Sequence, residues 1–261
     1  MNTTRSSLAA FGGLLLIAAC SSGTGPGAGP NVSLSFSSRL PAGVVAAPSR
    51  APAFSAAVTG ADTLTDGTNT LIITSAQLVL RKIELERQDV ATQCGTDPEP
   101  AGCEDFEVGP VLVDLPLTGG VNQQVAVNIP PGSYTEIKFT VHKVTGDAVD
   151  SAFVRQHPEF LNQSIRVQGT YNGTPFTYQS DLDVDQELHL DSALVVTDTT
   201  TSTNLTIRVV LADWFRSSSG GLVDPSTANV GGVNEGIVKE NIKNSMKAFV
   251  DENRDGDERN S

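Results

Sequence analysis

The sequence predicts an all-β protein, an antiparallel β-sandwich with one C-terminal α-helix. Three observations support this fold class. About ten short runs alternate apolar and polar residues, which is the period of a half-buried strand. Turn residues separate these runs at intervals of about 8 to 12 residues, as in sandwich folds. Apolar residues at helical spacing stand out in one segment, 233–250.

The composition excludes several classes of protein. Of the 261 residues, 39% are hydrophobic and 18% are charged, so the chain is apolar enough to bury a core. Its formal net charge of −13 has the wrong sign for a surface that follows phosphate groups. We therefore expect no nucleic-acid partner.

The first 19 residues have the pattern of a signal peptide. An apolar run, 8–19, follows the basic Arg5 and is too short to cross about 30 Å of hydrocarbon. The run continues into the sequence LIAAC at 16–20, which is similar to the lipobox of bacterial lipoproteins. This similarity implies cleavage before Cys20 and attachment of lipid to that cysteine. Several acyl chains on one residue would anchor the protein durably in a membrane.

The residues after the cysteine bear on localisation. Ser21 stands where an aspartate favours retention of enterobacterial lipoproteins in the inner membrane. We therefore predict a lipid-anchored protein of the bacterial cell envelope, at the outer membrane. Residues 20–30 contain the lipidated cysteine and a Gly-rich stretch without large apolar side chains, which predicts a flexible tether of about 17 to 20 Å. The alternative is an ordinary secretory signal with an unmodified Cys20.

Two further cysteines, Cys94 and Cys103, flank a short polar segment. Export would place them where disulfides persist, so we predict a disulfide between them. Such a short loop would contribute about 2 to 3 kcal/mol in the chain-entropy model. The alternative is a metal or redox pair, which the sequence supports less because it lacks C-x-x-C spacing and a nearby histidine.

The sandwich domain is predicted to cover 31–232. In its first strand, Val32, Leu34 and Phe36 alternate with serines, which predicts a strand with one buried face. The following stretch, 38–66, is rich in Ala, Pro and Ser and predicts a long loop.

The segment 70–87 is the most ambiguous part of the domain. Its first half is apolar at both odd and even positions, which predicts a strand buried on both faces or bulged near Arg81. A helix is the alternative, because 76–87 also contains good helix formers. The β-branched Ile72 and Ile73 favour the strand.

The next runs predict hairpins. Apolar residues occupy every second position in the segments 111–117 and 121–129. Gly119-Gly120 lies between these segments, which predicts a hairpin. Asn172-Gly173 predicts a second hairpin with a primed turn. Further short strands are predicted at 188–190, 193–196 and 205–211.

The C-terminal region is predicted to add the helix over 233–250. Trp214 and Phe215 precede it and are expected to cover the sandwich edge or to receive this helix. Three lysines at helical spacing are expected to form its solvated face: Lys239, Lys243 and Lys247.

The acidic tail, 251–261, opens like an EF-hand calcium loop. Oxygen-bearing side chains stand at positions 1, 3 and 5, and a glycine stands at position 6. The bidentate glutamate of position 12 has no counterpart, because Ser261 is position 11. A solvated, disordered terminus is the favoured interpretation and weak calcium binding is the alternative; no other cofactor is expected. The candidate calcium ligands are Asp251, Asn253, Asp255 and Asp257.

Other polar residues give little sign of a catalytic site. The aspartates of DLDVD at 181–185 are assigned to a solvent-facing hairpin end, with a calcium site as the alternative. The three histidines, His142, His157 and His189, lack the spacing of H-E-x-x-H. In the predicted strand, His142 alternates with the apolar residues, which predicts that its side chain is exposed. No G-x-S-x-G, Walker or dinucleotide motif is present, so we expect no enzyme.

The order of several segments resembles a known group of proteins. Between residues 70 and 257 the chain contains TLIITSAQLVLRKIEL, VLVDLPLTGG, VNIPPGSYTEIKFTVHKV, IRVQGTYNGTPFTY, LTIRVVLADWF and AFVDENRDGD. These segments are similar to uncharacterised bacterial lipoproteins related to the DUF4382-type domain of unknown function. The resemblance implies a cell-envelope sandwich of immunoglobulin-like or transthyretin-like type. It implies no reaction and no catalytic residues.

Together, these features predict a membrane-anchored, non-catalytic module of the cell envelope that binds an envelope protein or a glycan, or serves as a structural part. A calcium-stabilised assembly module that uses the loop 251–257 is the alternative. A hydrolase is the third hypothesis, and it would require a histidine to meet an acid and a nucleophile.

Overall fold

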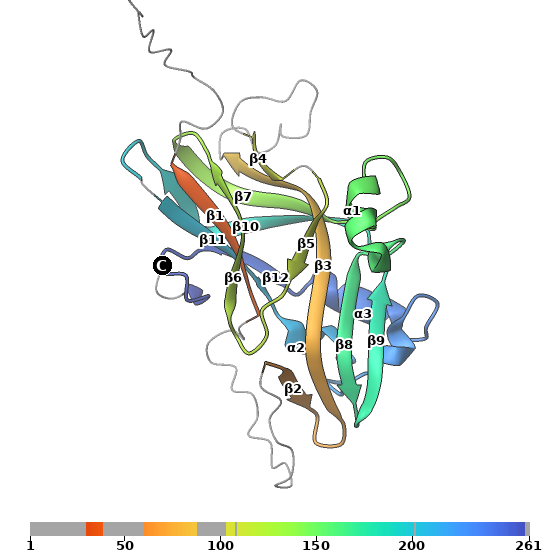
Figure 1. The fold of residues 1–261 in the computed structure, drawn as a ribbon. Helices are drawn as coiled ribbons and strands as arrows, with labels where there is room; N and C mark the ends of the chain where they lie inside the picture. The colour runs from red at the N-terminus through yellow and green to blue at the C-terminus, as the bar shows by residue number, and fades with distance from the viewer. Residues whose placement is uncertain (1–29, 39–59, 88–102, 108, 201, 259–261) are drawn as a thin grey trace, which may run out of the picture.

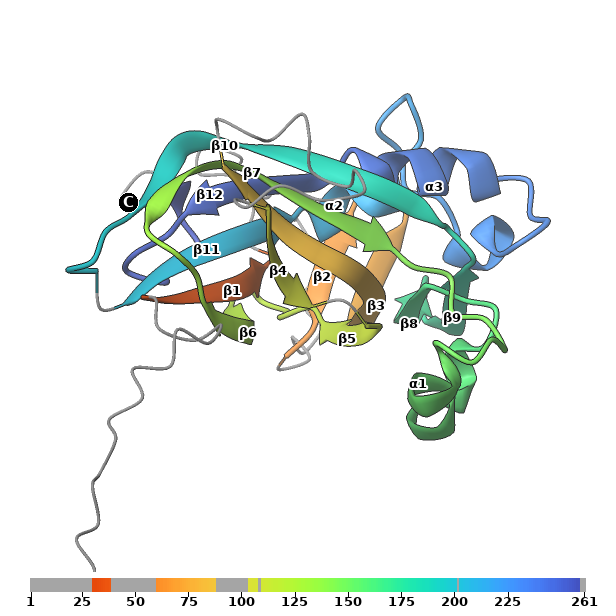
Figure 2. The same cartoon turned by 90° about the horizontal axis from the view of Figure 1, so that it is seen from above.

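The computed structural model describes residues 30–38, 60–87, 103–107, 109–200 and 202–258. These residues form two β-sheets with few helices, which confirms the predicted all-β sandwich with a helix near the C-terminus (Figure 1). Figure 2 shows the smaller sheet beneath strands β7 and β10 of the larger one. The apolar core fills the space between the two sheets.

The smaller sheet has four strands in the order β12-β11-β1-β6. They are β1 (Asn31–Ser37), β6 (Val121–Asn128), β11 (Ser202–Val209) and β12 (Met246–Val250). β1 is antiparallel to β6 but parallel to β11. The sheet is therefore mixed, and the first strand of the domain lies in its middle.

Both faces of β1 are buried, so the prediction of one buried face is wrong. Val32 and Leu34 are 0% exposed and contact the core. The serines between them are buried too, because the segment that follows β12 folds over their face of the sheet. There Arg254 donates a hydrogen bond to Ser33 (3.1 Å), and Gly256 packs against Ser37.

The larger sheet has eight strands, and β3 is its centre. The main path is β10-β7-β3-β8-β9, and β2, β4 and β5 also pair with β3. Its strands are β2 (Asp62–Thr65), β3 (Thr70–Arg87), β4 (Cys103–Glu107), β5 (Val111–Asp114), β7 (Gly132–Val141), β8 (Ile165–Tyr171), β9 (Thr174–Ser180) and β10 (Val184–Val196).

The long strand β3 confirms the strand prediction for 70–87, and of the two alternatives for its apolar pattern, the bulge near Arg81 is present. Its register against β7 shifts between Arg81 and Glu84, and Lys82 has a left-handed backbone (φ 52°). A bulge bends a strand and increases its twist. The first half of β3 therefore pairs with β8, whereas the second half pairs with β7 and β4 (Figure 1).

Some predicted strand connections are wrong. β5 pairs with β3 and β6 pairs with β1, so 111–117 and 121–129 join the two sheets instead of forming a hairpin. The alternation of apolar residues marks a buried face, but it does not tell to which sheet a strand belongs. In addition, β2 lies inside the predicted loop 38–66, and β10 is one long strand where two short ones were predicted.

The predicted turn at Asn172-Gly173 is confirmed. It joins β8 to β9, and its two residues have φ angles of 50° and 82°. Positive φ at both central residues is the signature of a type I′ turn.

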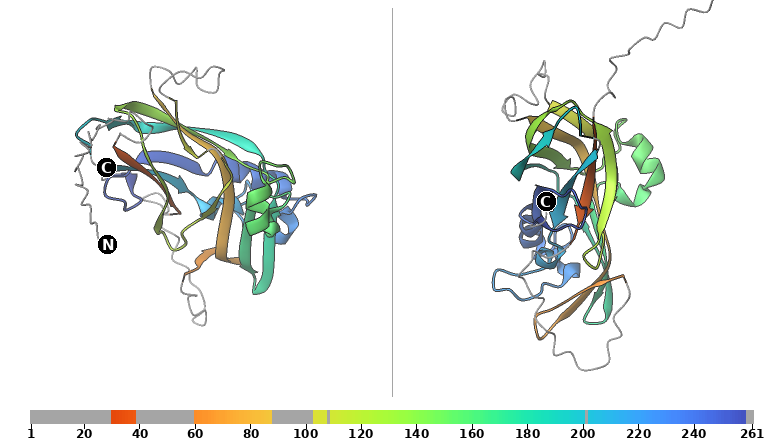
Figure 3. Two further views of the ribbon diagram at one scale, coloured as in Figure 1. Left: turned by 45° about the horizontal axis from the view of Figure 1, so that its top comes forward. Right: turned by 90° about the vertical axis from the view of Figure 1, so that its left-hand side faces the viewer.

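The helical segments are short. They are α1 (Ser151–Gln156), α2 (Leu211–Trp214), α3 (Glu235–Lys243) and the 3₁₀ turns η2 (Pro158–Phe160) and η3 (Pro225–Ala228). α1 and α3 lie on opposite sides of the β8–β9 hairpin (Figure 3). In the described part of the chain, every helix is too short or too polar to cross a membrane.

The C-terminal helix predicted over 233–250 is present but ends at Lys243. The second half of that segment forms β12, so the sandwich extends beyond residue 232. Its residues also alternate with period two, and pairing with β11 selects the strand. Lys247 therefore lies on β12, away from the predicted helical stripe. Trp214 is 0% exposed and donates a hydrogen bond to Ser245 (2.8 Å) just after α3, so it receives the helix as expected.

We predict that Gly169→Ala destabilises the protein. A Cβ atom at this position in β8 would lie 1.8 Å from the backbone oxygen of Ile72 on β3. Overpacking of this kind lowers the free energy of unfolding by about 1 to 3 kcal/mol. The midpoint of urea unfolding measures the effect. Gly146→Ala is the control, because its Cβ would enter open space; equal midpoints for the two variants would contradict the close contact.

Candidate functional site

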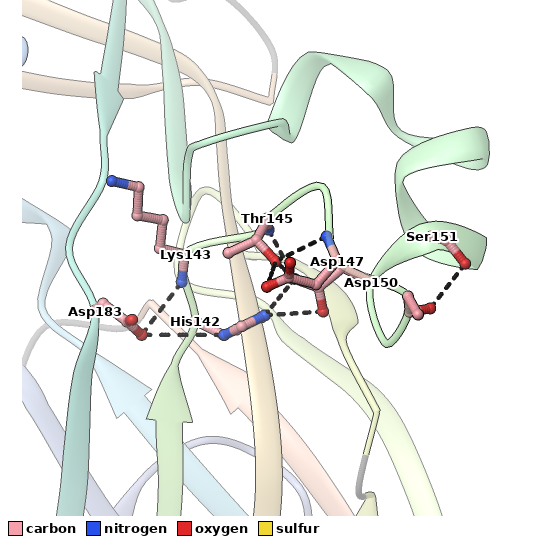
Figure 4. Close-up of polar contacts among 8 residues, drawn as sticks. His142, Lys143, Thr145, Asp147, Asp150, Ser151 and Asp183 are labelled. Atoms are coloured by element: carbon pink, nitrogen blue, oxygen red, sulfur yellow. Dashed lines mark hydrogen bonds and ion pairs between the residues drawn. The ribbon is translucent and has the colours of Figure 1, made fainter.

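The loop between β7 and α1 begins and ends with a buried histidine–aspartate pair. His142 is 7% exposed and Asp150 is 0% exposed. The Nε2 atom of His142 lies 3.0 Å and 3.1 Å from the two carboxylate oxygens of Asp150 (Figure 4). The prediction of an exposed His142 is therefore wrong. β7 ends at Val141, so the alternation of buried and exposed side chains along the strand does not extend to His142.

Asp150 closes the loop with several hydrogen bonds. The backbone N–H of Thr145 donates to its Oδ2 atom (2.7 Å), and the Thr145 hydroxyl lies 3.0 Å from the same oxygen. Burial by itself would raise the pKa of Asp150, but the hydrogen bonds from Thr145 and His142 outweigh it and hold this pKa below its usual value. The carboxylate therefore stays charged in the fold.

A second carboxylate faces the other ring nitrogen of His142. Asp183, just before β10, places its Oδ1 atom 4.0 Å from Nδ1 of the ring. Figure 4 shows the imidazole between Asp183 and Asp150. Asp183 also accepts a long hydrogen bond from the backbone N–H of Lys143 (3.4 Å). The ring is thus held between one buried and one exposed acid.

The contacts of His142 do not include a nucleophile. Ser151 lies on the far side of Asp150 and donates to the Ala148 carbonyl oxygen (2.8 Å; Figure 4). The Thr145 hydroxyl contacts Asp147 and Asp150. Among the described residues, no hydroxyl or thiol hydrogen-bonds to the ring. The contacts of His142 and Asp150 are those of a pair that holds its loop in place, rather than those of a catalytic dyad.

The two other histidines also have acidic neighbours. His157 lies 3.7 Å from Glu159 on the surface, and His189 lies 3.2 Å from Glu136. Each distance joins the Nδ1 atom of the histidine to a carboxylate oxygen of the glutamate. Neither pair involves His142 or its loop.

The backbone of β3 fixes the position of the histidine loop. Val79 accepts a hydrogen bond from the backbone N–H of His142 (2.9 Å) and donates one to the carbonyl oxygen of Ser164 (2.8 Å). Val144 donates to the carbonyl oxygen of Gln163 (3.0 Å). The start of the loop therefore lies beside the segment that enters β8.

A polar groove of about 420 Å³ opens beside these two segments. Carboxamide side chains dominate its lining, together with one ion pair and one apolar residue. The lining residues are Lys143, Asn162, Gln163, Gln179, Asp181, Asn229 and Val230. No sequence motif marks this site, because its residues come from four separate segments of the chain.

The aspartates of DLDVD each have a partner within the protein. Asp181 forms ion pairs with Lys143 (3.2 Å) and Lys239 (2.6 Å), and these contacts lower its pKa, the hydrogen bond from Lys239 most strongly. Asp185 accepts a hydrogen bond from Thr140 (2.6 Å). With Asp183 beside His142, the three carboxylates do not converge on a common point.

The outer face of the larger sheet carries a second cluster, which no motif in the sequence indicates. Glu136, Glu187 and His189 place one ligand-type atom each within 4.8 Å of one another. The ammonium group of Lys138 lies 2.9 Å from Glu86, 3.3 Å from Glu136 and 3.7 Å from Glu187. Lys138 thus supplies the positive charge where a metal ion would have to bind.

Burial and ion pairing together shift the pKa values of two residues in this cluster. Burial raises the pKa of Glu136. Burial would lower the pKa of Lys138, but its bonds to Glu86 and Glu136 reverse this and raise it above the usual value. The lysine therefore remains charged and paired.

The acidic C-terminal segment is folded as far as residue 258, so the expectation of a disordered tail is wrong there. Asp251 is 0% exposed and accepts hydrogen bonds from the hydroxyl of Thr206 (2.7 Å) and from the backbone N–H groups of Asp255 (3.2 Å) and Gly256 (3.0 Å). Asn253 also accepts a bond from Asp255 N–H (3.2 Å). The loop is wound around the Asp251 carboxylate.

This geometry bears on the candidate calcium ligands. The oxygens of Asp251, Asn253 and Asp255 already accept bonds from backbone N–H groups of the loop. Within the described ranges, a close group of three His, Cys, Asp or Glu ligands occurs only at Glu136, Glu187 and His189. The aspartates of 251–257 do not form such a group.

The predicted modifications fall outside what the structure describes. Cys20 and Cys94 lie outside the described residues. Cys103 opens β4, but its side chain is not among those described. Lipidation of Cys20 and a disulfide between Cys94 and Cys103 therefore stay predictions.

Three comparisons with known proteins found no match. No protein-family model, curated protein or solved structure matches the chain. The resemblance to lipoproteins of the DUF4382 type therefore stays a prediction from the sequence.

We predict that Asp150 makes the stability of the protein sensitive to acid. Its pKa is lower in the fold than its ordinary value of 3.8, so the charged carboxylate stabilises the fold above about pH 4. This stability is lost as the pH falls through the lower, folded pKa. Urea unfolding between pH 5 and pH 2.5 measures the change.

Asp150→Asn is expected to be less stable at pH 7 and to lose less stability on acidification than the natural protein. Asp198→Asn, at an exposed position, is the matched control and should follow the natural curve. If the free energy of unfolding of Asp150→Asn fell with pH in parallel to that of the natural protein, this carboxylate would not be the source of the acid sensitivity.

Proposed function

We propose that the protein is a lipid-anchored, non-catalytic binding or structural module of the bacterial cell envelope, at the outer membrane. The observation that carries this proposal is the sequence LIAAC at 16–20 behind a basic and apolar leader. A Gly-rich tether, 21–30, separates the cysteine from the first strand.

The position of β1 supports attachment through the N-terminus. The strand begins at Asn31, directly after the tether, and pairs along its length with β6 and β11. A load on the tether would thus act on backbone hydrogen bonds to two neighbouring strands. The bond from Arg254 to Ser33 adds a contact with the C-terminal segment.

The contacts of the histidines favour a module without catalysis. A general base in acyl transfer needs a nucleophile within about 2.6 to 3.2 Å. The contacts of His142 are instead with carboxylates, and its nearest acid, Asp150, holds the loop backbone. The hydrolase hypothesis therefore has less support than the binding module.

The calcium-stabilised assembly module is the alternative function. In its favour, Arg254 and Gly256 have left-handed backbones, with φ angles of 57° and 74°, so the loop curls around Asp251 as a cation loop would. Against it, the protein itself satisfies the Asp251 carboxylate, and the loop lacks a close group of three acids among its described residues. We favour the anchored module.

We predict that calcium does not stabilise the protein. Thermal unfolding in about 10 mM calcium, above the ~10⁻⁴–10⁻³ M dissociation constants of extracellular calcium modules, should have the same midpoint as in excess chelator. A rise of several degrees that is absent in Asp251→Asn would instead support the alternative function. Glu252→Gln, at an exposed position of the loop, is the control variant.

We predict that Cys20 carries the membrane anchor. Labelled palmitate should enter the natural chain and the Ser21→Ala variant but not Cys20→Ala. The Cys20→Ala protein should either accumulate as the uncleaved precursor or leave the detergent-rich phase on phase partitioning. Failure of the label to enter the natural chain, or unchanged partitioning of Cys20→Ala, would contradict the proposal.

A further inference from the structure

The polar groove beside the histidine loop contains hydrogen-bonding groups that the protein leaves unused. The Oε1 atom of Gln163 is buried and has no hydrogen-bond partner. In the described part of the chain, the carboxamides of Asn162 and Gln179 form no side-chain hydrogen bond either. Buried polar groups of native proteins are nearly always paired, so the buried oxygen of Gln163 indicates a polar occupant. The exposed Asn162 and the half-buried Gln179 offer further donors and acceptors to it.

The type of side chain indicates what that occupant offers. A carboxamide presents a donor and an acceptor side by side, and a hydroxyl is likewise both donor and acceptor. Three unused carboxamides around one groove thus match a molecule with several hydroxyl groups. The volume of about 420 Å³ lies within the ~300–1,000 Å³ range of small-molecule sites.

The charges of the groove favour a neutral molecule. Asp181 lies between two lysines, with Lys143 on one carboxylate oxygen and Lys239 on the other. Lys239 is also paired with Glu235. An anionic ligand would compete with Asp181 for its lysines, and a cationic ligand would compete with the lysines for Asp181, whereas a neutral molecule leaves these ion pairs intact.

A peptide is disfavoured, although β9 is an edge strand of the larger sheet. An added strand would pair with the edge groups of Thr177 and Gln179. The side chain of Asn229 already occupies them, because its Oδ1 accepts from Gln179 N–H (2.7 Å) and its Nδ2 lies 3.5 Å from the Thr177 carbonyl oxygen. Val230, 58% exposed, borders the same groove and offers an apolar contact for the C–H face of a sugar ring.

We propose that this groove binds a neutral sugar, with Asn162, Gln163 and Gln179 as its hydrogen-bonding residues. The proposal rests on the proposed function as a binding module and names the class of molecule bound. The carboxamides bind the sugar hydroxyls, Lys143 keeps its ion pair with Asp181, and Val230 contacts the ring.

The test uses the full lipidated chain, purified in a zwitterionic detergent that has no sugar headgroup. Palmitate labelling of this sample is checked first, so that failure of the anchor and failure of the groove are separate results. Saturation-transfer NMR then detects weak binding of glucose, N-acetylglucosamine and maltose. Glucuronate and trialanine are the charged and peptide probes.

We expect saturation transfer to at least one neutral sugar. Gln163→Ala and Gln179→Ala should each weaken its affinity tenfold or more. Val230→Trp changes an exposed residue, so the fold should persist while the larger side chain blocks the groove. Gln156→Ala, on an exposed face of α1, is the matched control and should bind as the natural protein does. Circular dichroism confirms that each variant is folded.

Three results would overturn the proposal. The first is the absence of transfer to all three neutral sugars in a labelled, folded sample. The second is transfer that persists unchanged in both Gln179→Ala and Val230→Trp. The third is transfer to glucuronate or trialanine alone, which would assign the groove to a charged or peptide ligand.

Discussion

The bulge in β3 is the constraint on which the rest of the fold depends. β3 pairs with five other strands, and at Lys82 its backbone adopts a left-handed conformation that bends it. Because of this bend, β8 and β7 leave β3 in different directions, and the polar groove lies near the point where they separate. Val79, just before the bulge, bonds through its backbone to both His142 and Ser164. The polar groove therefore forms because β3 pairs with β8 before the bulge and with β7 after it.

The smaller sheet depends on contacts between the two ends of the domain. β1 enters directly from the predicted tether, and its serine face would be exposed without the segment after β12. That segment brings Arg254 to Ser33 and places Gly256 against Ser37. Asp251 holds the segment in shape by accepting bonds from Thr206 and from the loop's own backbone. The acidic C-terminus thus has a structural role that its charge alone did not indicate.

Several elements were predictable because their signals are local. The β-branched residues of 70–87 indicated a strand, and its apolar pattern left a bulge near Arg81 as one of two alternatives, which the structure selects. Asn172-Gly173 specified its turn through backbone conformation. The hairpin predicted between 111–117 and 121–129 is wrong because alternation does not specify the partner strand. The second half of 233–250 is a strand because pairing with β11 outweighs its helical spacing.

The sequence by itself determined the all-β class, the turn at Asn172-Gly173 and the negative net charge, since these depend on neighbouring residues or on composition. The lipid anchor stays a prediction. Only the tertiary structure decided that His142 and Asp150 are buried together and that Gln163 and Gln179 line one groove. The reason is that such sites form through strand pairing between distant segments. Pairing is set by burial and backbone hydrogen bonds over the whole fold, and no local pattern encodes it.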